Sequence, residues 1–191
     1  MAGTPKEVAL LEAFLNTIDL ERFGAKASKP EQERDVINRP KLLKQWLVDR
    51  ALLRRGSRIT RGDVEDARRL RDGLRAMLRA SQGLTFDRAA LEDAQGLAAR
   101  SSVFVALSES SGPALHPGSG GVQGAFERIV ADVATASATD KLTRLKVCSA
   151  EDCQLVFYDH SRSRTKRWCA METCGNRVKT RRYRRRHQHE G

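Results

Sequence analysis

Four cysteines, Cys148, Cys153, Cys169 and Cys174, constrain this chain more than any other feature of its sequence. They form two Cys-x4-Cys pairs separated by fifteen residues, a layout typical of zinc ribbons and zinc fingers. Each pair can direct two sulfurs at one point, and the segment between them, 154–168, brings the pairs together. Four protein ligands leave no coordination position for water, so the sequence predicts one structural Zn²⁺.

Other uses of the four thiols are an iron–sulfur cluster or two disulfides. Disulfides suit small secreted scaffolds, but residues 1–16 lack the basic-then-apolar order of a secretory signal. No run of 18 or more apolar residues occurs, so we expect no membrane span and a cytoplasmic protein with reduced thiols. His160 lies between the cysteine pairs and could replace a ligand, although four thiolates already satisfy the metal.

The cysteine module is too small to bury a large core, so zinc ligation has to supply on the order of 10 kcal/mol of its folding free energy. Residues 154–158 are β-prone and predict one strand of a short hairpin, with Arg167 and Trp168 on the partner strand. Gly175 allows the backbone to approach a sulfur closely, and Asn176 is a suitable cap for a helix that follows. We expect Val178 to lie on the same stripe of this helix as Cys174.

Positive charge is concentrated around and after the cysteines. The chain has a formal net charge of +11, which favours a polyanionic partner. The segment 177–186 contains seven Lys and Arg residues and no acid, and a second basic group lies in the loop between the pairs. A solvated, disordered tail is the alternative, but a zinc module would anchor the helix. The nucleic-acid contacts predicted from this pattern are Arg162, Arg164, Lys166, Arg167, Arg177, Lys179, Arg181, Arg182, Arg184 and Arg185.

The first half of the chain has helical periodicity. Apolar residues at helical spacing predict a helix over 8–18, and a polar stretch follows over 21–38. Asn38 and Pro40 then indicate the start of a second helix, which Gly56 ends. Thr60 and Asp63 resemble a capping box before a long helix to Leu78, and Thr85 indicates the start of another.

The middle of the chain changes character. Residues 103–107 are β-prone and predict a hairpin with 114–116 across a turn-rich stretch. The glycines at 118–121 favour a flexible joint before a helix over 122–136, and Thr139 or Asp140 could cap a short helix that leads to Val147. The fold class predicted is mainly α with a small β-hairpin in an N-terminal domain, 1–140. A zinc-ribbon or treble-clef-like module, 146–187, ends in the basic helix.

The residues around the second cysteine pair resemble a known family. The run from Trp168 to Arg177, Trp-Cys-Ala-Met-Glu-Thr-Cys-Gly-Asn-Arg, preceded by Phe-Tyr-Asp at 157–159 and Ser-Arg at 161–162, is similar to the CGNR zinc finger. The resemblance covers about 146–187 and implies that the four cysteines bind zinc and that the basic helix binds DNA. Family members often have Asn-Gly where this loop has Ser163 and Arg164, a difference that adds positive charge.

The preceding domain resembles the ABATE domain, which accompanies CGNR fingers in stress-induced transcription regulators of bacteria. Its marks are Phe-Leu-Asn-Thr at 14–17, Leu-Leu-Lys-Gln-Trp-Leu at 42–47 and Leu-Arg-Asp-Gly-Leu-Arg at 70–75. The resemblance implies a mainly helical domain with a small β element, and our hypothesis is that this domain senses a ligand or forms a homodimer. Asn16 and Arg71 are the candidate ligand-sensing residues, and buried structural hydrogen bonding is the alternative role for both.

These observations favour a zinc-dependent DNA-binding transcription regulator. The alternatives are an RNA-binding accessory factor and a protein-interaction module with a solvated basic tail. We do not expect an enzyme, because the predicted metal site has no open position and the sequence contains no His-Glu-x-x-His, Gly-x-Ser-x-Gly or phosphate-binding loop.

Overall fold

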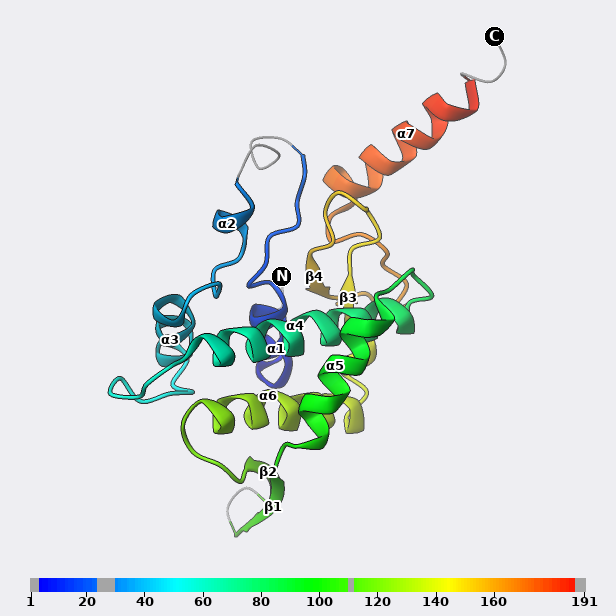
Figure 1. Ribbon diagram of the computed structural model, residues 1–191. Coiled ribbons are helices and arrows are strands. Elements are labelled where there is room, and N and C mark those ends of the chain that lie inside the picture. Colours follow the sequence, from blue (N-terminus) through cyan, green and yellow to red (C-terminus); the bar gives the residue numbers. More distant parts are fainter. Residues whose placement is uncertain (1–3, 24–29, 110–111, 188–191) are drawn as a thin grey trace.

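The computed structural model describes residues 4–23, 30–109 and 112–187. Its centre is the long helix α4, which packs against α1 and α5, while α6 contacts α1 from the same core (Figure 1). The fold is mainly helical, with a small hairpin and a zinc module that ends in a basic helix, as predicted. The helices are α1 (Lys6–Leu15), α2 (Glu31–Arg34), α3 (Pro40–Asp49), α4 (Arg61–Ser81), α5 (Arg88–Ala99), α6 (Gly121–Ala138) and α7 (Asn176–His187).

The start of α4 follows from its local sequence. The Thr60 side chain accepts a hydrogen bond from the Asp63 amide, and the Asp63 carboxylate accepts one from the Thr60 amide, so the predicted capping box is confirmed. Farther along α4, Gly73 permits a close approach of α5. A Cβ added there would lie 2.1 Å from the Ala94 Cβ and 2.5 Å from the Ala90 carbonyl oxygen.

Two helix starts differ from prediction. Helix α3 begins at Pro40 as expected, but its cap is Arg39 in an extended conformation, so Asn38 is not the cap residue. Helix α5 is capped by Asp87, whose side chain accepts from the Ala90 amide, and not by Thr85. In both cases the helix begins later in the chain, and so closer to its first buried residue, than the predicted cap residue implied.

The predicted hairpin in the middle of the chain is confirmed. Strands β1 (Val103–Ser108) and β2 (Gly112–Pro117) are antiparallel and extend away from the helices (Figure 1). The buried carboxylate of Glu127 on α6 fixes the hairpin base, because it accepts hydrogen bonds from the Ser102 and Ser119 amides. The joint at 118–121 is therefore held by α6.

The zinc module contains a second hairpin whose pairing was predicted wrongly. Strand β4 (Val156–Tyr158) pairs with β3 (Leu145–Val147) and not with Arg167 and Trp168. Leu145 and Val147 are fully buried, which favours an extended strand, so the predicted helix up to Val147 is only a 3₁₀ turn over Leu142–Arg144. Hairpin β3–β4 therefore brackets the first cysteine pair.

The zinc module and the helices share one core. Leu145, Val147 and Val156 pack in the same buried cluster as residues of α1, α4 and α6. The Asn16 side chain bonds the backbone C=O and N–H of Val156 at 2.8 and 2.9 Å, and Gln82 bonds both backbone groups of Val147. Two amide side chains thus act as partners for the outer edges of this hairpin. Within the described residues, no helix is long and apolar enough to cross a bilayer.

Candidate metal centre and nucleic-acid interface

The four cysteine sulfurs converge on one point. All four lie within 4.8 Å of one another, with 3.7 Å between the Cys153 and Cys169 Sγ atoms and 3.6 Å between those of Cys169 and Cys174. A disulfide would need about 2.05 Å, whereas a tetrahedron of about 2.3 Å Zn–S bonds has sulfur–sulfur edges of about 3.8 Å. The sulfur spacing therefore fits a single zinc ion and excludes two disulfides.

Backbone turns place the sulfurs. Cys148 directly follows β3 and donates its amide to the Leu155 carbonyl, and the Cys153 amide donates to Ala150, which closes the first turn. Cys169 precedes a π-helical turn, Met171–Gly175, that contains Cys174 and continues into α7. Asn176 has helical backbone angles and lies inside the helical run, so the prediction that it caps the helix was wrong. The last ligand is thus part of the helix that it anchors.

The electrostatics of the cluster also suit a divalent cation. Hydrogen bonds from Cys153 and Cys169 lower the pKa of the Cys148 thiol, and the same contacts raise the pKa of both donors. Without a cation, deprotonating a second cysteine would place two thiolates side by side, and their repulsion opposes it. A cation bound by all four sulfurs removes that conflict, as in structural Cys₄ zinc sites.

A small apolar shell surrounds the sulfurs. Phe157 is buried against them, and Trp168 and Val178 pack on the same cluster, as expected for Val178. His160 is exposed, and its ring lies edge-on to Tyr158 with centroids 4.9 Å apart. It is not a member of the four-sulfur cluster, which agrees with a site completed by thiolates.

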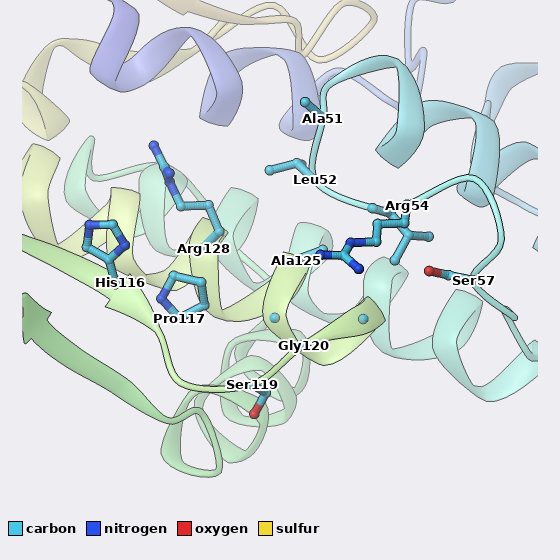
Figure 2. Close-up of a pocket in the computed structure, with 13 residues that line it drawn as sticks. Ala51, Leu52, Arg54, Ser57, His116, Pro117, Ser119, Gly120, Ala125 and Arg128 are labelled. Atoms are coloured by element: carbon cyan, nitrogen blue, oxygen red, sulfur yellow. The ribbon is translucent and has the colours of Figure 1, made fainter.

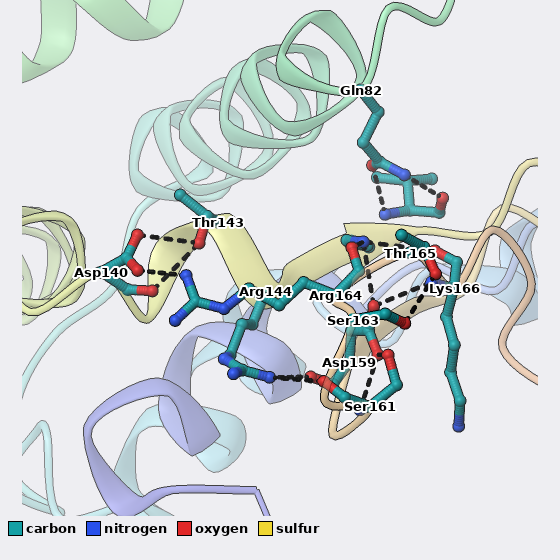
Figure 3. Close-up of polar contacts among 12 residues, drawn as sticks. Gln82, Asp140, Thr143, Arg144, Asp159, Ser161, Ser163, Arg164, Thr165 and Lys166 are labelled. Carbon is teal, nitrogen blue, oxygen red and sulfur yellow. Dashed lines mark hydrogen bonds and ion pairs between the residues drawn. The ribbon is translucent and has the colours of Figure 1, made fainter.

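The loop between the cysteine pairs is organised by a buried ion pair that sequence reasoning missed (Figure 3). The Asp159 carboxylate accepts hydrogen bonds from the Lys146 Nζ at 3.0 Å, the Lys166 amide at 2.9 Å, and the amide and hydroxyl of Ser161. Burial alone would raise the pKa of Asp159, but these bonds outweigh it and hold the pKa well below its ordinary value. A fixed anion thus shapes a loop whose outer residues are cations.

All four predicted loop cations are exposed. Arg164 has a positive φ of 55° and pairs with Asp140, so its charge is partly compensated. The Arg167 guanidinium lies 5.7 Å from the centroid of the Trp168 ring beside the metal site. Arg162 and Lys166 have no side-chain ion pair with any described residue. The loop therefore presents a basic surface close to the base of α7.

Helix α7 projects away from the rest of the molecule (Figure 1). None of its residues is buried, it carries no acidic side chain, and Tyr183 at its centre is 64% exposed. Five of its cations form no ion pair with the described part of the chain: Lys179, Arg182, Arg184, Arg185 and Arg186. These five charges repel one another unless an anionic partner neutralises them.

Two predicted contact residues on α7 are engaged with the zinc module. Arg177 donates from Nε and Nη2 to both carboxylate oxygens of Asp152 at 3.0 Å, and Arg181 pairs with the same carboxylate. The Arg177 guanidinium also lies 3.5 Å from the centroid of the Phe23 ring. Burial raises the pKa of Asp152, but the arginine hydrogen bonds outweigh it and lower the pKa. Asp152 was missed because only the fold brings it beside α7; a hint was the spacing of Arg177 and Arg181 on one helix face.

The two candidate sensing residues lie in structural positions. Asn16 bonds the β4 backbone, as described above. Arg71 has no exposed surface; it pairs with Asp35 at 2.9 Å and with Asp72 at 2.8 Å, and contacts the Thr17 hydroxyl at 3.4 Å. The structure brings neither residue to the four-sulfur cluster or to the basic surface.

Fold and site together define a zinc-finger protein whose finger is packed on a helical domain. Residues 144–187 match the model of the CGNR zinc finger family. Residues 9–144 match ABATE, a family described as "Putative stress-induced transcription regulator". This second match spans more than half of the chain, so the chain belongs to the ABATE family. A comparison with curated proteins finds no match.

Proposed function

We propose that this protein is a zinc-dependent transcription regulator that binds duplex DNA through α7 and the adjacent zinc loop. The observation that carries the proposal is the surface of α7, a helix free of acids on which five exposed cations have no ion pair with the described residues. Phosphates of a duplex would neutralise these charges and release condensed counterions, which favours binding. The regulator description of the family points to DNA as the polyanion.

Arg177 and Arg181 have a different role in this proposal. Their ion pairs with Asp152 fasten the first turns of α7 to the turn between Cys148 and Cys153. Zinc holds Cys174 in the same helical run, so the helix is fixed at its base by a metal and a carboxylate. A helix fixed in this way can meet a groove in one orientation, with arginines on phosphates and base edges.

The test measures fluorescence anisotropy of a labelled DNA duplex with the zinc-loaded chain at several salt concentrations. If about five cations contact phosphates, log affinity falls with log salt at a slope of about −4.5. Removing one contact in Arg184→Gln should reduce the steepness by about 0.9. Arg177→Gln should weaken binding more than Arg184→Gln does. Affinity independent of salt would overturn the proposal.

Two competing partners are separated by the same assay. Structured RNA that displaces the duplex at lower concentration than unlabelled duplex would identify an RNA-binding factor. A protein-interaction module predicts that the slope is unchanged when Arg184 and Arg185 are both replaced by Gln. The DNA proposal requires unlabelled duplex to displace the labelled duplex at a lower concentration than the RNA does. It also requires the slope of log affinity against log salt to become shallower in the double variant by the equivalent of about two phosphate contacts.

A further inference from the structure

A cleft lies in the helical domain, far along the chain from the zinc site. It has a volume of about 720 Å³ and lies between the connection from α3 to α4, the end of β2 and the first turn of α6 (Figure 2). Clefts of this size accommodate small molecules. Neither Asn16 nor Arg71 lines it, so it is separate from the residues that the family resemblance marked for ligand sensing.

The polar side chains that line this cleft are basic or neutral. Arg54, His116 and Arg128 come from three separate segments, and Figure 2 shows Arg54 pointing into the cleft. None of the thirteen lining residues is acidic. Arg128 pairs through its Nε with Asp132 at 2.9 Å, a carboxylate outside the lining, so Arg54 is the lining cation left to meet a ligand. The lining thus has a positive charge that the cleft itself does not balance.

The floor of the cleft adds backbone donors. Gly120 caps α6 without a side-chain hydrogen bond, and the first turn of the helix has no acid. A Cβ added to Gly120 or Gly121 would meet no atom within 4 Å, so a ligand can approach the backbone there. Glu127 holds this turn through Ser119 and does not line the cleft. Arg54 and the positive end of α6 therefore face one space, which an anion would stabilise.

The remaining lining is apolar. Leu52, Leu53, Pro117 and Ala125 contribute the other side chains. We propose that this cleft binds a small organic anion, with a phosphate or carboxylate group between Arg54 and the first turn of α6 and an apolar body against Leu52 and Pro117. This inference does not depend on DNA binding, because no residue of α7 or of the zinc module lines the cleft.

The experiment uses phenyl phosphate as probe with the ¹⁵N-labelled, zinc-loaded full chain. Two-dimensional NMR should show shifts of the Gly120 and Gly121 amides that saturate at one site. Inorganic phosphate should shift the same amides at concentrations at least tenfold higher, since it lacks the apolar body, and phenol should not shift them. Shifts confined to α7, or equal potency of phenol, would overturn the proposal.

Matched variants locate the anion. Arg54→Gln should weaken phenyl phosphate binding at least tenfold, whereas Arg55→Gln, an exposed neighbour outside the lining, should leave it unchanged. Benzoate in place of phenyl phosphate distinguishes a carboxylate from a phosphate ligand at the same amides. Equal losses in the two arginine variants would show that only the general positive charge of the chain attracts the probe. Unchanged binding in Arg54→Gln would contradict the site.

Discussion

Arg71 is the largest side chain with no exposed surface, and its charge is fully engaged inside the helical domain. Burial by itself lowers the pKa of Arg71, but hydrogen bonds to Asp72 and Asp35 outweigh this effect and raise it. The guanidinium therefore stays charged and ties α4 to the segment after α2. An ion pair of this kind specifies how elements pack, and it becomes costly when one partner is lost.

Replacing Arg71 by Met should lower the free energy of unfolding by about 3–5 kcal/mol, because Asp35 would stay buried without its closest partner. Urea unfolding of the zinc-loaded protein measures this. The control is Arg69→Met, since Arg69 is exposed on the same helix and its one ion pair with the described residues, to Asp66, is 3.5 Å long; a change of at most about 0.5 kcal/mol is expected. Equal effects of the two variants would refute a special role for Arg71.

Glu127 gives the helical domain a pH dependence. Burial raises the pKa of Glu127, but hydrogen bonds from Ser102, Ser119 and Gln123 outweigh it, so the folded pKa lies below the ordinary value of 4.5. Its stabilisation is present above pH 4.5 and is lost as the pH falls through the folded pKa. Glu127→Gln should be less stable than the wild type at pH 7, and the difference should shrink below pH 4.5. A difference that stays constant down to pH 3.5 would be inconsistent with this role; the comparison cancels zinc release, which both proteins share.

At the scale of elements, α4 and α5 approach each other closely at Gly73. Gly73→Ala should lower the free energy of unfolding by more than about 2 kcal/mol, because the new Cβ would overlap Ala94 and the Ala90 carbonyl. Gly96→Ala should instead stabilise the protein by up to about 1 kcal/mol, since an added Cβ there meets no atom within 4 Å and alanine favours helix. Thermal unfolding of the two variants checks the opposite signs.

Elements with local signals could be predicted from the sequence, and elements made by distant contacts could not. The capping box of α4 needs only Thr60 and Asp63, so it is visible in a short window. Strand β3 is three residues long, and its extended state depends on pairing with β4 and on the amide side chain of Gln82. The four-sulfur cluster was predictable from the spacing of the cysteines in the sequence. The ion pairs of Asp152 with Arg177 and Arg181 were not, because only the folded chain brings Asp152 beside α7.

At the scale of the whole molecule, zinc and the helical core are coupled. Strands β3 and β4 bury Leu145, Val147 and Val156 in the core of the helices, and they also bracket the first cysteine pair. Arg75 reinforces this contact by donating to the Leu15 and Gln154 carbonyls at 2.7 and 2.6 Å. Burial lowers the pKa of Arg75 to about 10, so it remains charged at neutral pH. Loss of the metal should therefore also destabilise the helical core.

Removing zinc with a chelator should unfold the metal module and also lower the melting temperature of the helical domain. Hydrogen exchange followed by mass spectrometry should show faster exchange in α4 near Gln82 as well as in α7. Cys174→Ser should reproduce this pattern without a chelator. Unchanged exchange throughout α4 after zinc removal would contradict the coupling and indicate two independent units.

The central claim is that zinc ligation and the ion pairs of Asp152 with Arg177 and Arg181 together orient α7 on DNA. Selection of genomic DNA fragments tests this claim most directly. The zinc-loaded wild type should enrich a defined set of fragments at physiological salt. Asp152→Asn should keep its zinc and its overall positive charge but lose that enrichment, because α7 is no longer fixed by Arg177 and Arg181. Equal enrichment of the same fragments by Asp152→Asn would contradict the claim and leave α7 as an unoriented basic segment.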